Sequence, residues 1–161
     1  MALEIVDYQP AHQPDFARLN LRWLEAYFTV EPIDEQVLGD PDTHIISPGG
    51  SILMAVDGSN VLGTCALKVH GTQELELTKM AVDPASQGQG AGKLLMSAAI
   101  SRFRGSGRRL LWLETNHILT TAIGLYQHFG FQRIGDGPRP GSGYQRSDYY
   151  MVWQHGGPES P

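Results

Sequence analysis

A glycine-rich segment between an apolar strand and an amphipathic helix is where the sequence points most directly to chemistry. Its residues are Gln87, Gly88, Gln89, Gly90, Ala91, Gly92 and Lys93. Alternating glycines let backbone N–H groups come close to a bulky anion, and the next helix points the positive end of its dipole at the same place. The segment therefore predicts a cradle for a phosphate or pyrophosphate. A glycine-rich surface turn before a core helix is the alternative.

The spacing of these glycines excludes two common nucleotide-binding motifs. The dinucleotide fingerprint G-x-G-x-x-G needs a third glycine where Lys93 stands. The nucleoside-triphosphate loop needs Ser or Thr after its Gly-Lys pair, but Leu94 follows here.

The elements on both sides of the cradle can be read from residue periodicity. Before it, residues 75–82 contain the apolar, strand-type residues Leu75, Leu77 and Val82, and Asp83-Pro84 ends the strand. After it, apolar residues spaced by three and four predict one buried helix face. These residues are Ala91, Leu94, Leu95, Ala98, Ala99 and Phe103.

The rest of the chain alternates between strand and helix patterns. Strands are predicted over 3–8, 51–56, 61–69, 110–115, 131–134 and 149–153, and helices over 14–28, 32–38 and 117–129. The order β-α-α-β-β-β-α-β-α-β-β predicts a mixed α/β layered fold. We expect a single domain over 1–155 and a disordered tail over 156–161.

Composition excludes several functional classes for this chain of 161 residues. Its net charge of −5 argues against nucleic-acid binding, and no segment is long and apolar enough to span a membrane. The single cysteine, Cys65, lies in an apolar run, which predicts a core residue in a cytoplasmic protein. The six histidines form no metal-ligand pattern, so no metal is predicted, and the G-x-S-x-G motif of serine hydrolases is absent.

Two motifs resemble the signatures of one family. Gln87-x-x-Gly90-x-Gly92 resembles the [Q/R]-x-x-G-x-[G/A] signature with which the GNAT superfamily of N-acetyltransferases binds the pyrophosphate of acetyl-CoA. The segment 113–131, which runs from LETN to LYQHFGF, resembles the second signature of that family. The order of elements also matches. The resemblance implies a mixed, mostly antiparallel central sheet flanked by helices on both faces.

The same resemblance implies roles for the cradle and its neighbours. Main-chain groups of Met80, Ala81 and Val82 would contact the pantetheine arm of acetyl-CoA and the thioester carbonyl, and segment 87–93 would hold the pyrophosphate. Lys93 would add a positive charge there or simply be solvated. Asn116 would contact the pantetheine, cap the following helix, or do both.

Tyr126 and Glu76 are the candidate catalytic residues. At the position that Tyr126 matches, family members have a tyrosine that protonates the CoA thiolate. The alternative is that Tyr126 is a core residue. Glu76 lies six residues before Val82, the register of the catalytic base in the histone-acetyltransferase branch. A buried glutamate there could take the amine proton. A half-exposed strand residue, a water base and Glu114 are the alternatives.

In the strand that carries Glu76, successive side chains are expected to point to opposite faces of the sheet. This alternation divides the strand into one set of residues on the face of Glu76 and a second set on the opposite face. The first set is Glu74, Glu76, Thr78 and Met80, and the second is Leu75, Leu77 and Lys79.

The sequence thus predicts transfer of acetyl from acetyl-CoA to a primary amine, on a small molecule or a protein, within a ternary complex. A non-catalytic acyl-CoA-binding sensor or regulatory module is the alternative. A homodimer fits the family, but no heptad decides it. The residues expected to line the acceptor site are Trp23, Tyr27, Phe28, Glu31, Tyr144 and Tyr149.

Overall fold

The computed structural model describes residues 2–154, so the predicted tail over 156–161 and the domain boundary at 155 lie outside the described residues. The strands are β1 (Glu4–Asp7), β2 (Ser51–Asp57), β3 (Asn60–His70), β4 (Glu74–Val82), β5 (Leu110–Thr115), β6 (Phe131–Arg133) and β7 (Tyr149–Trp153). The helices are α1 (Gln13–Tyr27), α2 (Pro32–Gly39), α3 (Ala91–Gly105) and α4 (Thr120–His128). Short helical turns lie at Pro10–His12, Asp42–Ile46 and Pro84–Ser86.

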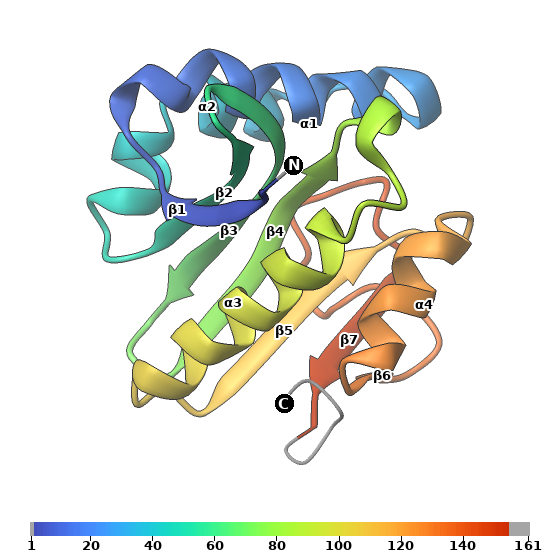
Figure 1. The fold of residues 1–161 in the computed structure, drawn as a ribbon. Coiled ribbons are helices and arrows are strands. Elements are labelled where there is room, and N and C mark those ends of the chain that lie inside the picture. Colours follow the sequence, from blue (N-terminus) through green and yellow to red (C-terminus); the bar gives the residue numbers. More distant parts are fainter. Residues whose placement is uncertain (1, 155–161) are drawn as a thin grey trace.

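The strands form one 7-stranded sheet in the order β1-β2-β3-β4-β5-β7-β6. Every neighbouring pair is antiparallel except β4 and β5. Helices cover both faces (Figure 1): α3 and α4 pack over one hydrophobic cluster, and α1 and α2 pack over the other. The predicted fold class, a mostly antiparallel sheet between two layers of helices, is confirmed.

Helix α3 buries a face that is rotated about the helix axis relative to the predicted one, with Met96 and Ile100 buried in place of Leu94 and Ala98. Its buried side chains lie in two rows, in which successive residues are four positions apart. They are Ala91, Leu95, Met96, Ala99, Ile100 and Phe103. Leu94, expected on this face, lies at its margin and is 42% exposed.

Helix α4 begins three residues later than predicted. Residues 116–119 form a turn instead, in which the Asn116 side chain accepts a hydrogen bond from the Ile118 N–H at 3.0 Å. The residue that precedes the helix is Leu119, so the expectation that Asn116 caps it is wrong.

Strand β4 carries an irregularity that reverses its faces. Lys79 has a φ of +52°, and the pairing with β3 shifts register opposite Cys65. Beyond this bulge, Met80 and Val82 pack with the cluster under α3, whereas the Lys79 side chain contacts α2. The face prediction is therefore wrong for Met80 and Lys79, because a bulge adds one residue to the two-residue alternation.

Strands β4 and β5 part soon after they meet. Their parallel ladder joins only Glu74–Glu76 to Leu110–Trp112. Beyond Glu76, no described residue forms a ladder with this edge of β4, and the strands diverge toward α1 and α4 (Figure 1). The divergence leaves main-chain groups of β4 facing a pocket.

Candidate functional site

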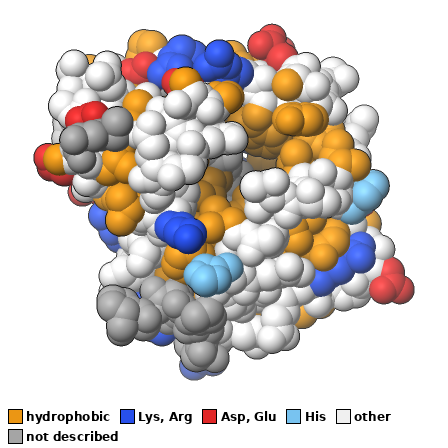
Figure 2. Space-filling model, turned by 45° about the vertical axis from the view of Figure 1, so that its right-hand side comes forward, with side chains coloured by type: hydrophobic (Ala, Val, Ile, Leu, Met, Phe, Trp, Pro, Cys, Tyr) orange, Lys and Arg blue, Asp and Glu red, His pale blue; other side chains and the backbone are white. Residues whose placement is uncertain are grey.

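A pocket of about 860 Å³ opens where β4 and β5 diverge. On this side of the molecule, Figure 2 shows a hollow with hydrophobic side chains along its walls. We call one part the cradle half, lined by Met80, Ala81, Val82, Gln87, Gly88, Gly90, Ala91, Gly92, Lys93, Asn116 and Tyr126. We call the other the aromatic half, lined by Trp23, Tyr27, Phe28, Glu76, Lys79, Glu114, Tyr144 and Arg146. Among the predicted cradle residues, Gln89 does not line the pocket.

The cradle is a main-chain structure. Gly88 and Gly90 have φ values of +87° and +88°, a left-handed conformation that favours glycine. The first bond of helix α3 runs from the Leu94 N–H to the Gly90 carbonyl at 3.0 Å, so the earlier N–H groups have no helical acceptor. Within the segment 87–93, the N–H groups of Gly88, Gly90, Ala91, Gly92 and Lys93 have no hydrogen-bond acceptor among residues 2–154. Together with the helix dipole they favour an anion here.

The side chain of Asp83 shapes the turn that leads into the cradle. The Asp83 carboxylate accepts a hydrogen bond from the Ala85 N–H at 2.9 Å and starts the turn at Pro84–Ser86. The Gly92 Cα lies so close to α4 that an added Cβ would meet the Leu125 side chain at 3.4 Å. The start of α3 therefore packs directly against the helix that carries Tyr126.

Tyr126 lies at the boundary between the cradle and the hydrophobic core. Its ring packs edge-on against the Phe131 ring, with 6.1 Å between the two ring centroids. The Tyr126 hydroxyl donates to no group within residues 2–154. Burial raises the pKa of the Tyr126 phenol, which keeps the hydroxyl protonated at neutral pH. The side chain can therefore offer a proton to a ligand in the pocket.

Two carboxylates line the aromatic half. Glu76 is only 4% exposed and lies 2.9 Å from the Nε2 atom of His70, so the alternative of a half-exposed strand residue is wrong. Glu114 has one buried oxygen, Oε1, without a hydrogen-bond partner among the described residues. Burial raises the pKa of Glu114; the Ser142 hydroxyl opposes this change and the Glu76 carboxylate adds to it.

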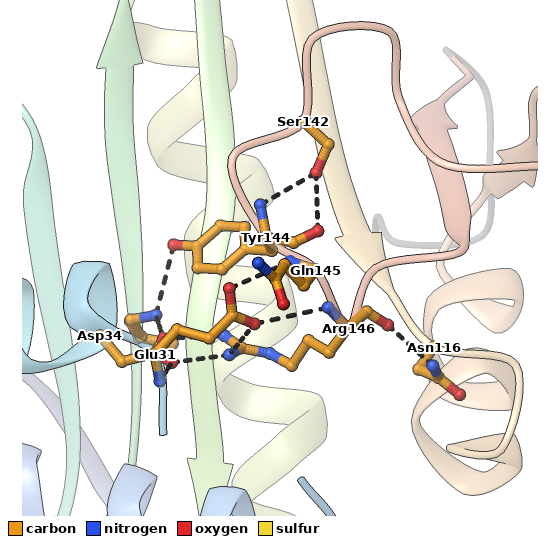
Figure 3. A network of polar contacts seen from close by, with 8 residues as sticks. Glu31, Asp34, Asn116, Ser142, Tyr144, Gln145 and Arg146 are labelled. Carbon is orange, nitrogen blue, oxygen red and sulfur yellow. Dashed lines mark hydrogen bonds and ion pairs between the residues drawn. The ribbon is translucent and has the colours of Figure 1, made fainter. Parts of the chain in front are cut away.

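A buried ion network forms the floor of the aromatic half, and sequence reasoning missed it (Figure 3). Asp34 on α2 is fully buried and accepts hydrogen bonds from Lys79 Nζ at 2.7 Å and from Arg146 at 2.6 and 2.8 Å. Burial opposes its ionisation, but the hydrogen bonds and charges of Arg146 and Lys79 outweigh that cost and lower the pKa of Asp34 to about 2. Burial also lowers the pKa of Lys79, although Asp34 opposes the change.

The network also ties the loop after β6 to the rest of the site. The Glu31 carboxylate accepts hydrogen bonds from the main-chain N–H groups of Gln145 and Arg146 at 3.0 and 3.4 Å. Lys79 donates to the Tyr144 hydroxyl at 3.3 Å, and Asn116 donates to the Arg146 carbonyl at 2.7 Å. No local pattern could reveal these contacts, because the partners are as many as 115 positions apart.

The structure brings together only part of the expected acceptor lining. Trp23, Tyr27, Phe28 and Tyr144 face the pocket, but Glu31 and Tyr149 do not line it. Glu31 is engaged with Arg146 at 3.2 Å, and the Tyr149 ring packs against Arg133 at 4.1 Å.

Other sequence expectations concern the rest of the molecule. Cys65 is fully buried, as expected of a core residue, and burial raises the pKa of its thiol to about 12. Within residues 2–154, no cluster of His, Cys, Asp and Glu could hold a metal ion. None of the helices described here combines the length and the hydropathy that a membrane crossing needs.

Comparisons with known proteins agree with this geometry. The family model described as "Acetyltransferase (GNAT) family" matches residues 12–131. The [ribosomal protein bS18]-alanine N-acetyltransferase of Haemophilus ducreyi is 43% identical over 61 residues, which are 38% of this chain and 42% of that protein. Across eight curated relatives, the match spans between 21% and 58% of their own length.

Solved structures share the fold. An acetyltransferase of the GNAT family from Staphylococcus aureus Mu50 superimposes with a TM-score of 0.84 at 20% identity, over 94% of this chain and 98% of that one. YncA from Salmonella typhimurium, solved with its cofactor acetyl-CoA, has a TM-score of 0.75 at 18% identity, over 96% of this chain and 94% of that one.

Proposed function

Because this chain belongs to the acetyltransferase (GNAT) family, we propose that it transfers the acetyl group of acetyl-CoA to a primary amine by direct attack in a ternary complex. One observation carries the proposal: a main-chain anion cradle opens into the same pocket as a protonated tyrosine and two carboxylates. Relatives named as N-acetyltransferases support the reaction class.

Acetyl-CoA would bind along the cradle half as a co-substrate. The free N–H groups between Gly88 and Lys93 would hold its pyrophosphate, with the Lys93 ammonium as an added charge. The unpaired edge of β4 at Met80–Val82 would bind the pantetheine amides as a neighbouring strand does. A main-chain N–H on that edge would donate to the thioester carbonyl oxygen, where negative charge develops.

The chemistry follows from these positions. The amine lone pair attacks the thioester carbon, the C–N bond forms, and the C–S bond breaks with its electron pair on sulfur. The Tyr126 hydroxyl donates its proton to the departing thiolate and is reprotonated from solvent. Its raised pKa keeps the phenol protonated at neutral pH, and it also makes the phenol a weaker acid than an ordinary tyrosine.

The proton of the attacking amine would go to one of the two carboxylates. Glu76 is buried and already bonded to His70, which could pass the proton onward. Glu114 has a free oxygen and a raised pKa, so it would accept a proton nearer neutral pH than an ordinary glutamate does. Separate Glu76→Gln and Glu114→Gln variants would identify the base. The variant that loses the base should no longer show the rise of turnover with pH.

The direct test is release of CoA thiol from acetyl-CoA in the presence of a panel of amines, with the acetylated product identified by mass. The panel should include a peptide with an N-terminal alanine, since one relative is named for that residue on a ribosomal protein. We expect amine-dependent thiol release. Binding of acetyl-CoA without turnover of any amine would contradict a transferase and favour an acyl-CoA-binding module.

A further inference from the structure

The two cations that line the aromatic half are both engaged by carboxylates. Arg146 is held by Asp34 through both terminal nitrogens, at 2.6 and 2.8 Å, and by Glu31 at 3.2 Å. Lys79 is held by Asp34 at 2.7 Å, and its side chain is 2% exposed. Figure 3 shows the Arg146 guanidinium turned toward Glu31 and Asp34. Two negative charges thus cancel these two positive charges, and neither cation is left for a ligand.

The two carboxylates that face the same space form no ion pair with a lysine or arginine within residues 2–154. The Glu76 carboxylate bonds to the His70 ring, and one oxygen of Glu114 has no hydrogen-bond partner among the described residues. Arg139, which lies near Glu114, pairs with Glu74 at 3.3 Å. Lys93 is the remaining pocket-lining cation of residues 2–154, and it belongs to the cradle half. The aromatic half therefore presents excess negative charge.

From this imbalance, and resting on the function proposed above, we propose that the acceptor is a cationic primary amine with no carboxylate beside it, such as a simple amine or a peptide N-terminus. An ammonium group is attracted by the carboxylates and by the faces of aromatic rings. A free α-amino acid would place its carboxylate next to Glu76 and Glu114, where no unpaired cation can offset its desolvation. The site therefore discriminates against free amino acids.

Matched acceptors test this discrimination. L-phenylalanine, L-phenylalaninamide and 2-phenylethylamine share one aromatic body, and only the first carries a carboxylate. The third compound removes the carboxylate without making the amine less basic, so a preference for it cannot come from a larger neutral fraction. We expect kcat/KM, measured by thiol release, to favour both carboxylate-free compounds by at least about tenfold.

Equal use of all three compounds, or preference for the free acid, would overturn the inference while leaving the transferase intact. Failure of these compounds and of every other amine would overturn the proposed function itself, and the inference with it. The two failures are thus distinguishable in one assay.

A charge-changing variant links the preference to the network. Glu31→Gln keeps an oxygen that can accept from the loop N–H groups but leaves part of the Arg146 charge uncancelled. The preference for 2-phenylethylamine over phenylalanine should fall by about threefold or more. Glu35→Gln makes the same charge change at an exposed position of α2 that does not line the pocket, and should leave the preference unchanged. Equal shifts in both variants would contradict a local effect.

Discussion

The two halves of the pocket differ in the groups that line them: main-chain groups in the cradle half and side chains in the aromatic half. The cradle half presents main-chain N–H groups from a short segment that contains two left-handed glycines and the start of one helix. The aromatic half depends on side chains, with a fully buried aspartate at the centre of an ion network that joins α2, β4 and the loop after β6. The cradle is thus a property of a few consecutive residues, whereas the aromatic half is a property of the whole fold.

This difference has a physical consequence. A main-chain cradle tolerates many side chains but depends on backbone conformation, whereas a buried ion network depends on every member because a lone buried charge is costly. Variants in the cradle half should therefore damage the binding of acetyl-CoA. Variants in the aromatic half should damage stability and the choice of acceptor.

The largest expected effect is on stability, from Asp34→Ala. The change leaves the Lys79 and Arg146 charges without their buried partner, and we expect it to lower the free energy of unfolding by about 3–5 kcal/mol. Urea unfolding measures this change. Glu35→Ala on the same helix is exposed and should change it by less than about 0.5 kcal/mol. A loss no larger than that of the control would mean that the network does not hold the aromatic half together.

Gly90→Glu should break the cradle half instead. The residue has a φ of +88°, so a side chain strains the backbone, and the carboxylate repels a pyrophosphate. We expect the Kd for acetyl-CoA to rise about a hundredfold or more by calorimetry. Gly135→Glu adds the same side chain at a φ of +71° outside the pocket and should leave the affinity unchanged. Unchanged affinity in a folded Gly90→Glu protein would refute the cradle.

Acid should weaken the aromatic half selectively. The pKa of Asp34 is lowered from 3.8 to about 2, so its stabilising contribution is complete above its ordinary pKa and is lost as pH falls toward the folded value. The advantage of the wild type over Asp34→Asn in urea unfolding should shrink by about 2 kcal/mol between about pH 5 and about pH 2. A difference that stays constant across this range would show that Asp34 is not held ionised by its partners.

The smallest expected effect comes from Tyr126→Phe, in the cradle half. It removes the hydroxyl and keeps the packing against Phe131. A CoA thiolate leaves more readily than most leaving groups, so we expect turnover to fall only about tenfold, which is less than the usual contribution of a general acid. The Kd for acetyl-CoA should stay within about twofold. Equal turnover in the variant would remove the proposed role of Tyr126.

The cradle half could be predicted from the sequence to a greater extent than the aromatic half. The order of strands and helices depends on short-range patterns, and the structure has the elements in that order. The glycine-rich segment and Tyr126, singled out from the sequence, line one pocket. The bulge at Lys79 was missed because strand alternation assumes a regular ladder. The Asp34 network was missed because its members meet only in the folded chain, 45 to 112 positions apart.

The late start of α4 has a similar cause. A strand followed by asparagine is typical of a helix cap, but the Asn116 side chain bonds to the Ile118 N–H and to the Arg146 carbonyl instead. The second of these partners belongs to a loop whose path no local pattern reveals.

The most direct test of the account is a calorimetric titration of the wild-type protein with acetyl-CoA and CoA, with ATP as the control. A main-chain cradle continued by the open edge of β4 predicts micromolar binding of both CoA species and no binding of ATP, which lacks the pantetheine arm. Absence of CoA binding by the folded protein, or equal binding of ATP, would contradict the cradle half and leave only the fold.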